Sequence, residues 1–130
     1  MAKILVIDDE AEIRQVLKEL LEREGHEIEI APDGEEAISA FRNTSPDIVL
    51  VDIVMPRKDG VGVIREIRKE NSSVKIIAIS GGGKLNSASF NPETISTTVY
   101  LAAADAAGAD RTLPKPFNKE EILSAIRALG

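Results

Sequence analysis

Residues 3–10 read KILVIDDE, an aliphatic run that stops at three acidic side chains. The pattern recurs twice: Asp47–Val51 leads to Asp52, and Val74–Ile79 leads to Ser80. Continuous aliphatic runs of this length are typical of strands that are buried on both faces of a parallel sheet. Because the carboxyl ends of parallel strands share one edge of the sheet, we expect the polar residues after each run to meet there.

Helical patterns separate these runs. Apolar residues recur at helical spacing over residues 10–24, after Asp33, after Asp59, and over about 119–129. In the first segment the predicted buried stripe consists of Ile13, Val16, Leu17, Leu20 and Leu21. A further helix is expected from about Pro92 to Ala107, after a long glycine-rich stretch that begins at Gly81.

The alternation of strands and helices predicts a parallel sheet with right-handed crossovers and helices on both faces. Glu27–Ala31 alternates charged and apolar residues, which favours an exposed edge strand, and Arg111–Leu113 is a short fifth strand. The three continuous runs are then central. The sequence therefore predicts an α/β fold: a three-layer, doubly wound (βα)5 flavodoxin-like architecture with a five-stranded parallel sheet in the order 2-1-3-4-5.

The composition narrows the classes of function. A chain of 130 residues without a composition break predicts one domain over 1–130, with no output domain. The net charge of −6 argues against a nucleic-acid-binding surface, and the lack of cysteine excludes disulfides. No apolar run approaches the roughly 20 residues that span a bilayer, and no signal-peptide pattern precedes the first strand, so we expect a cytoplasmic protein without membrane contact.

The predicted sheet edge suits phosphoryl chemistry on an aspartate. A buried Asp52 beside Asp8 and Asp9 is costly unless a cation neutralises the charges, and Mg²⁺ prefers carboxylate oxygens and also binds phosphate. With the metal bound, Asp52 can act as a nucleophile toward a phosphoryl group. Lys115 and the Ser80 hydroxyl can then stabilise the charge that develops on that group.

These residues carry a family resemblance over the whole chain. The motifs are VIDDE (6–10), DIVLVDIVMPRKDG (47–60), the strand-end Ser80, and the segment 108–117 with its GAD and LPKPF sequences. With these motifs in this order, the chain resembles a receiver domain of two-component response regulators, of the stand-alone kind found in chemotaxis regulators.

The resemblance implies a role for each residue of the acidic site. Asp52 is the implied phosphoacceptor. Asp9 is the implied direct ligand of Mg²⁺, and Asp8 binds the ion through water or supports Asp9. The backbone carbonyl of Ile53 completes the implied ligand set.

The resemblance also implies how the signal passes. Lys115 would bind the phosphoryl group, and Ser80 would be the hydroxyl that responds to it. The donor would be a phosphohistidine on a partner kinase or on a phosphotransfer protein of a phosphorelay, and the output would be a contact with a downstream protein target. Such a protein is not an enzyme toward other substrates, since it catalyses only its own phosphorylation and dephosphorylation.

Alternatives remain open at this stage. Thr112 replaces the aromatic residue that usually stands three positions before the lysine, which leaves a phosphorylation-independent adaptor on the same fold as the main alternative; Tyr100 or Phe90 could substitute for that aromatic. A phosphohydrolase would need a cap domain and a second carboxylate two residues after Asp52, where this chain has Val54. A flavin-binding protein would need a Ser/Thr-rich loop after the first strand, where this chain has acidic residues.

Overall fold

The computed structural model describes residues 2–53, 60–79, 102–114 and 117–129. The strands are β1 (Lys3–Ile7), β2 (Glu27–Ala31), β3 (Ile48–Asp52), β4 (Lys75–Ile79) and β5 (Arg111–Leu113). The helices are α1 (Ala11–Arg23), α2 (Gly34–Thr44), α3 (Gly60–Glu70) and α5 (Lys119–Leu129), and residues 102–107 are also helical. Within the described ranges, no helix is both long and apolar enough to cross a membrane.

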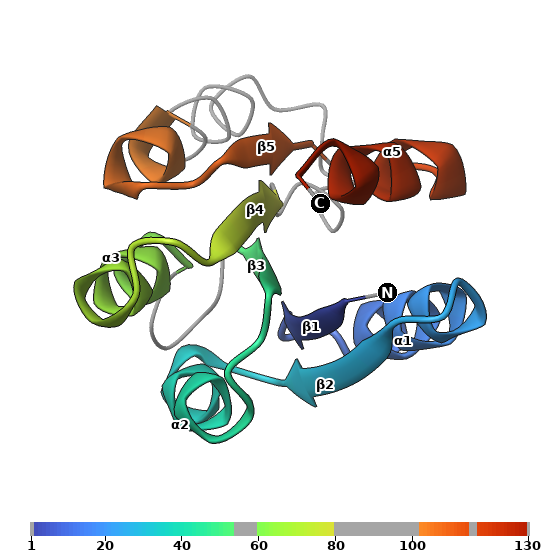
Figure 1. The fold of residues 1–130 in the computed structure, drawn as a ribbon, viewed down its shortest axis with the longest axis horizontal. Helices are drawn as coiled ribbons and strands as arrows, with labels where there is room; N and C mark the ends of the chain where they lie inside the picture. The colour runs from blue at the N-terminus through green and yellow to red at the C-terminus, as the bar shows by residue number, and fades with distance from the viewer. Residues whose placement is uncertain (1, 54–59, 80–101, 115–116, 130) are drawn as a thin grey trace.

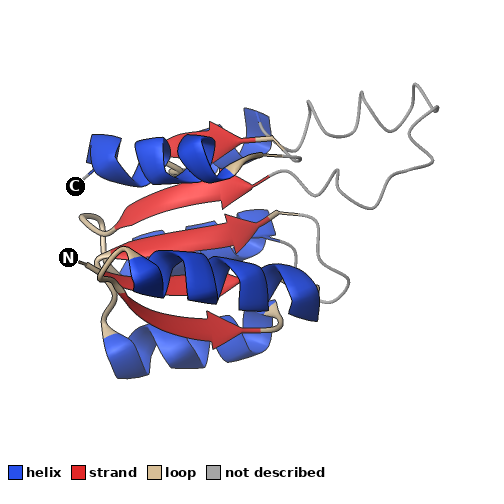
Figure 2. Ribbon diagram, turned by 90° about the vertical axis from the view of Figure 1, so that its right-hand side faces the viewer, coloured by secondary structure: helices blue, strands red, loops and turns tan. Residues whose placement is uncertain are grey.

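The five strands form one parallel sheet in the order β2-β1-β3-β4-β5, which confirms the predicted topology. All strands point the same way in Figure 2, so their carboxyl ends lie along a single edge. Helices α1 and α5 cover one face of the sheet, and α2 and α3 cover the other (Figure 1). The three-layer, doubly wound arrangement is therefore confirmed as well.

The core explains why the central strands are continuously apolar. Successive residues of a strand point to opposite faces, and both faces are covered here. Leu5 and Ile7 of β1 pack in the cluster under α2 and α3, whereas Ile4 and Val6 pack in the cluster under α1 and α5. Every position of such a strand is buried, so every position is apolar.

Two apolar side chains differ from this pattern. Val16 was predicted to lie in the buried stripe of α1, and that prediction is wrong: its side chain is 61% exposed, while Leu17 and Leu21 of the same stripe are buried. β2 is an edge strand, as the alternating sequence predicts, but Ile30, which shares a face with the buried Ile28, is 38% exposed. The exposure of Val16 has no explanation within the described fold.

Helix ends follow the sequence signals. The Asp33 side chain accepts a hydrogen bond from the N–H of Glu36 at 2.9 Å and begins α2. Asn118 and Glu121 exchange hydrogen bonds of 2.8 Å in a reciprocal capping box at the start of α5. Gly108 ends the helical residues 102–107 with a φ of +122°; the earlier part of that predicted helix lies outside the described residues.

Candidate metal and phosphoryl-acceptor site

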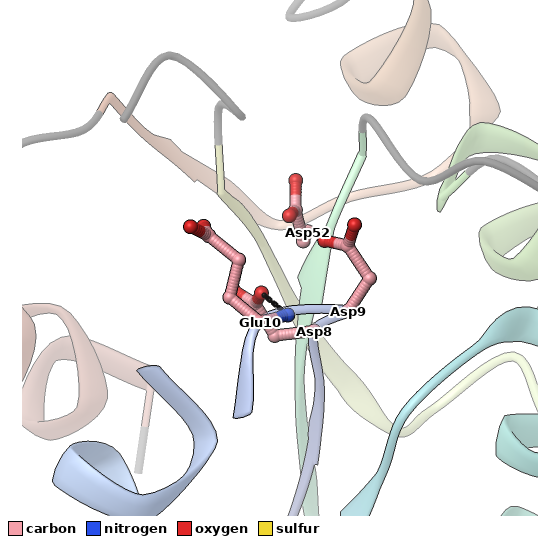
Figure 3. Close-up of side chains that lie close together, drawn as sticks. All are labelled: Asp8, Asp9, Glu10 and Asp52. Atoms are coloured by element: carbon pink, nitrogen blue, oxygen red, sulfur yellow. Dashed lines mark hydrogen bonds between the residues drawn. The ribbon is translucent and has the colours of Figure 1, made fainter. Parts of the chain in front are cut away.

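The acidic residues meet at the carboxyl edge of the sheet, as expected. β1 ends at Ile7 and leads directly into Asp8, Asp9 and Glu10, and β3 ends on Asp52. Because β1 and β3 are adjacent parallel strands in register, their carboxyl ends lie at the same height. Figure 3 shows the four carboxylate side chains at this point.

The four carboxylates form a compact cluster. One oxygen from each of Asp8, Asp9, Glu10 and Asp52 lies within 4.8 Å of the others. Asp52 is fully buried and Asp8 is 1% exposed, whereas Asp9 and Glu10 are half-buried. The cluster thus has a buried floor and a side that is open to solvent.

Backbone contacts fix the orientation of Asp8. Its Oδ1 accepts a hydrogen bond from the N–H of Glu10 at 2.9 Å, drawn as a dashed line in Figure 3. Its own N–H donates to the Ala31 carbonyl at 3.2 Å, and its carbonyl accepts from Nη1 of Arg14 at 2.7 Å. Asp8 therefore supports the turn into α1 as well as lining the cluster, and its role at the metal ion stays a prediction.

Asp52 is held by the chain that follows it. The N–H of Ile53 donates to the Ile79 carbonyl at 3.0 Å, and the N–H of Gly60 donates to the Ile53 carbonyl at 3.1 Å. A Cβ at Gly60 would lie 2.4 Å from the Cα of Ile53 and 2.5 Å from the carbonyl oxygen of Asp52, so only glycine allows α3 to begin here. The Ile53 carbonyl already has a hydrogen-bond partner, and its role as a metal ligand stays a prediction.

The donor set fits Mg²⁺. Octahedral Mg–O bonds of about 2.0–2.1 Å place ligand oxygens roughly 2.9 Å apart in neighbouring positions and roughly 4.1 Å apart across the ion. Oxygens within 4.8 Å of one another need only small adjustments, or a bridging water, to reach these separations. Four neighbouring carboxylates also repel each other, and a divalent cation removes most of that repulsion.

Other predicted residues lie outside the described ranges. Ser80 follows β4 and Lys115 follows β5, and β4 and β5 end together at the paired residues Ile79 and Leu113. The structure describes neither Ser80 nor Lys115, so both remain predictions. Their strands do end at the edge that carries the acidic cluster.

The structure describes only part of the region in which the family usually has its signalling aromatic residue. Thr112 of β5 is exposed and pairs with Ala78 of β4, while Tyr100, Phe90 and Val54 lie outside the described residues. The proposal that Tyr100 or Phe90 replaces the missing aromatic is therefore untested.

Sequence reasoning did not assign a function to Glu10. Its carboxylate lies with the three aspartates, although the turn could have directed it elsewhere. The available signal was its place at the end of β1, directly after two acidic residues.

Comparison with known proteins identifies the class. The response regulator receiver domain matches residues 4–127, and the chain belongs to this family. Relatives include the response regulator MprA of Mycobacterium sp. (strain KMS), 38% identical over 98% of this chain and 50% of MprA. The transcriptional regulatory protein CpxR of Klebsiella pneumoniae is 36% identical over 99% of this chain and 49% of CpxR. The chain thus spans about half the length of these curated relatives.

Solved structures give the same answer over the full chain. Chemotaxis protein CheY4 of Vibrio cholerae superimposes with a TM-score of 0.80 at 28% identity, covering 100% of this chain and 99% of CheY4. Response regulator TrrA of Thermotoga maritima, solved in complex with Mg(2+)-BeF, has a TM-score of 0.77 at 35% identity and covers both chains completely. The two-component signalling class is therefore shown by sequence and by fold.

Proposed function

We propose that this chain accepts a phosphoryl group on Asp52 from a phosphohistidine of a partner kinase or phosphotransfer protein. An Asp52 carboxylate oxygen attacks phosphorus, an O–P bond forms, and the P–N bond to the donor imidazole breaks; because the donor ring carries a proton on its other nitrogen, it leaves as neutral imidazole. The single observation that carries the proposal is the buried Asp52 within a cluster of four carboxylates at the carboxyl edge.

In this proposal, different residues around Asp52 bind the metal ion and the phosphoryl group. Asp9 and Asp8 would hold the Mg²⁺ ion, and Glu10 lies beside them in the cluster. When bound, Mg²⁺ neutralises the carboxylates and the phosphoryl oxygens, so that two anionic groups can approach. Lys115 and Ser80 contact the phosphoryl group in the role that the family resemblance gives them. TrrA, which matches this chain over its full length, was solved with Mg(2+)-BeF, and this supports the same ion here.

The output in this proposal is a protein contact. Phosphorylation shifts an equilibrium between two conformations, and a downstream target binds one of them better. CheY4, which the chain covers to 99%, supports an output through contacts of the receiver domain itself. MprA and CpxR extend to about twice the matched length, and an output through a further domain is the competing arrangement.

A surface beside the site suits the phosphodonor. Helices α1 and α5 follow the carboxyl ends of β1 and β5, and residues of both helices line a groove of about 300 Å³. Its apolar lining includes the exposed Val16 together with Leu20 and Phe117, and its charged lining residues are Glu19, Arg23 and Lys119. A donor protein that brings its histidine over Asp52 would cover this groove, which accounts for an exposed valine on α1.

Intact-protein mass after incubation with acetyl phosphate tests the proposal. We expect a gain of one phosphoryl group that requires Mg²⁺ and is absent in Asp52→Asn. No gain, under conditions that label a known receiver, would favour the phosphorylation-independent adaptor. A gain that persists in Asp52→Asn would place the acceptor elsewhere.

A further inference from the structure

A second polar network lies at the opposite end of β4 and β5, away from the acidic cluster. Its centre is Arg68, in the last turn of α3, whose side chain is 18% exposed. Nε donates to the Gly108 carbonyl at 3.0 Å, and Nη1 donates to the Val74 carbonyl at 2.6 Å. Nη2 donates to Oδ2 of Asp110 at 2.8 Å. One guanidinium thus joins α3, the entry to β4 and the entry to β5.

Asp110 connects this network to the sheet. Its Oδ2 also accepts the N–H of Ile76 at 2.8 Å, and its own N–H donates to the Ile76 carbonyl at 2.8 Å. Since Ile77 pairs with Arg111, these bonds continue the β4–β5 ladder by one residue. A slip of β5 by one residue would move the Asp110 side chain about 3.3 Å along β4 and away from the Ile76 N–H that it binds.

Gly108 makes room for the guanidinium. A Cβ at this position would lie 2.9 Å from Cγ and 3.0 Å from Nε of Arg68, and the φ of +122° disfavours any other residue. The next residue, Ala109, packs in the core with the fully buried Ala104. Within the GAD sequence at 108–110, Gly108 and Asp110 both bind Arg68, and Ala109 between them packs in the core.

β5 needs such an anchor. It has three residues, a single neighbouring strand, and exposed side chains at Arg111 and Thr112. Short exposed edge strands specify their register weakly, and a slip of one residue moves the chain by about 3.3 Å and turns each side chain to the other face. Such a slip would shift the point at which Leu113 leaves the sheet toward Pro114 and Lys115.

We propose that Arg68, Asp110 and Gly108 form a positioning clamp for the phosphoryl-transfer reaction. The clamp holds β5 in register and so sets where the segment carrying Lys115 starts, although it lies about 10 Å, or three strand residues, from the level of Asp52. This inference rests on the proposed function, because it assigns the clamp to that same reaction.

The test compares the rate of Asp52 phosphorylation by acetyl phosphate in the full chain with Arg68→Gln and Asp110→Asn. We expect the maximal rate to fall about tenfold, since small misplacements of a catalytic group cost that much or more. The Kd for Mg²⁺ should stay unchanged, because the carboxylates lie on β1 and β3. In a Lys115→Ala background, the clamp variants should cause no further loss.

The control is Arg42→Gln. Arg42 makes an equivalent two-point contact with Glu70 between α2 and α3, exposed and without a link to β5. It should keep the wild-type rate. Circular dichroism confirms that each variant is folded; Arg68→Lys, which keeps the charge but not the fork, replaces Arg68→Gln if the latter does not fold.

Each outcome decides the matter. The clamp would be overturned, and the proposed function left intact, by either of two results. One is an equal loss of phosphorylation rate in the wild-type and Lys115→Ala backgrounds, and the other is no loss of rate in folded clamp variants. A wild-type protein that takes up no phosphoryl group would overturn the proposed function and the clamp with it.

Discussion

Replacing Asp52 by asparagine should stabilise the metal-free protein although it removes the reactive group. The reason is the crowding of charge: four carboxylates have oxygens within 4.8 Å of one another, and Asp52 is fully buried among them. Folding must bring these charges together without a bound cation. Asparagine keeps the shape of the side chain and removes one charge.

The size of the effect follows from this separation. At 4.8 Å, the upper limit of the separations within the cluster, two unit charges repel by roughly 0.9 kcal/mol in a water-like medium and roughly 3.5 kcal/mol at an effective dielectric constant of about 20. Asparagine also weakens the favourable contacts of the Asp52 carboxylate. We therefore expect a net increase of about 1–2 kcal/mol in the free energy of unfolding.

Urea unfolding of the wild type and of Asp52→Asn, in EDTA and in saturating Mg²⁺, measures this change in the free energy of unfolding. In EDTA, Asp52→Asn should be more stable than the wild type. In Mg²⁺ the wild type should gain about 2.7 kcal/mol at a hundred times Kd, and the variant much less, so the difference should shrink or reverse.

The control for this experiment is Asp105→Asn, which changes an exposed carboxylate outside the cluster. Its free energy of unfolding should stay close to that of the wild type both in EDTA and in Mg²⁺. A variant that is less stable than the wild type in EDTA, with a neutral control, would refute the argument from charge crowding.

Three further predictions use separate features. Gly60→Ala should lower the free energy of unfolding by roughly 1–3 kcal/mol, because its Cβ would overlap the backbone of Ile53; wild-type stability in urea would contradict the contact. Val16→Ser should slow phosphoryl transfer from a histidine-phosphorylated donor protein but not from acetyl phosphate. If the variant matches the wild-type rate with both donors, the groove between α1 and α5 is not where the donor protein binds. Hydrogen bonding to Arg42 lowers the pKa of Glu70 below its usual 4.5, so this pair stabilises the fold above that pH and loses its effect as the pH falls through the lowered pKa. Arg42→Gln should therefore reduce stability at neutral pH but not at strongly acidic pH, as pH-dependent thermal unfolding would show.

Much of the fold was predictable because the signals are local. Ile4–Ile7 and Ile48–Val51 are continuously apolar since both faces of their strands are covered, while Glu27–Ala31 includes charged residues because several of its side chains are exposed. The capping residues Asp33 and Asn118 act within three residues of themselves. Such patterns need no knowledge of distant parts of the chain.

The acidic site was predictable for a related reason. Residues at the ends of adjacent parallel strands must meet, so the positions of Asp8, Asp9 and Asp52 follow once the strand order is known. The prediction for Val16 failed because helical periodicity identifies an apolar face but not how far its neighbours extend over it. Glu10 was not assigned because the direction of a side chain in a turn depends on the surrounding fold.

The sequence by itself determined the strands, their order and the acidic edge, since each depends on hydrophobic periodicity and on strand ends. Only the tertiary structure decided that Arg68 reaches Asp110, 42 residues away, across an opening that Gly108 leaves. No local pattern marks that pairing. It exists because α3, β4 and β5 pack together, and packing brings together residues that the sequence keeps apart.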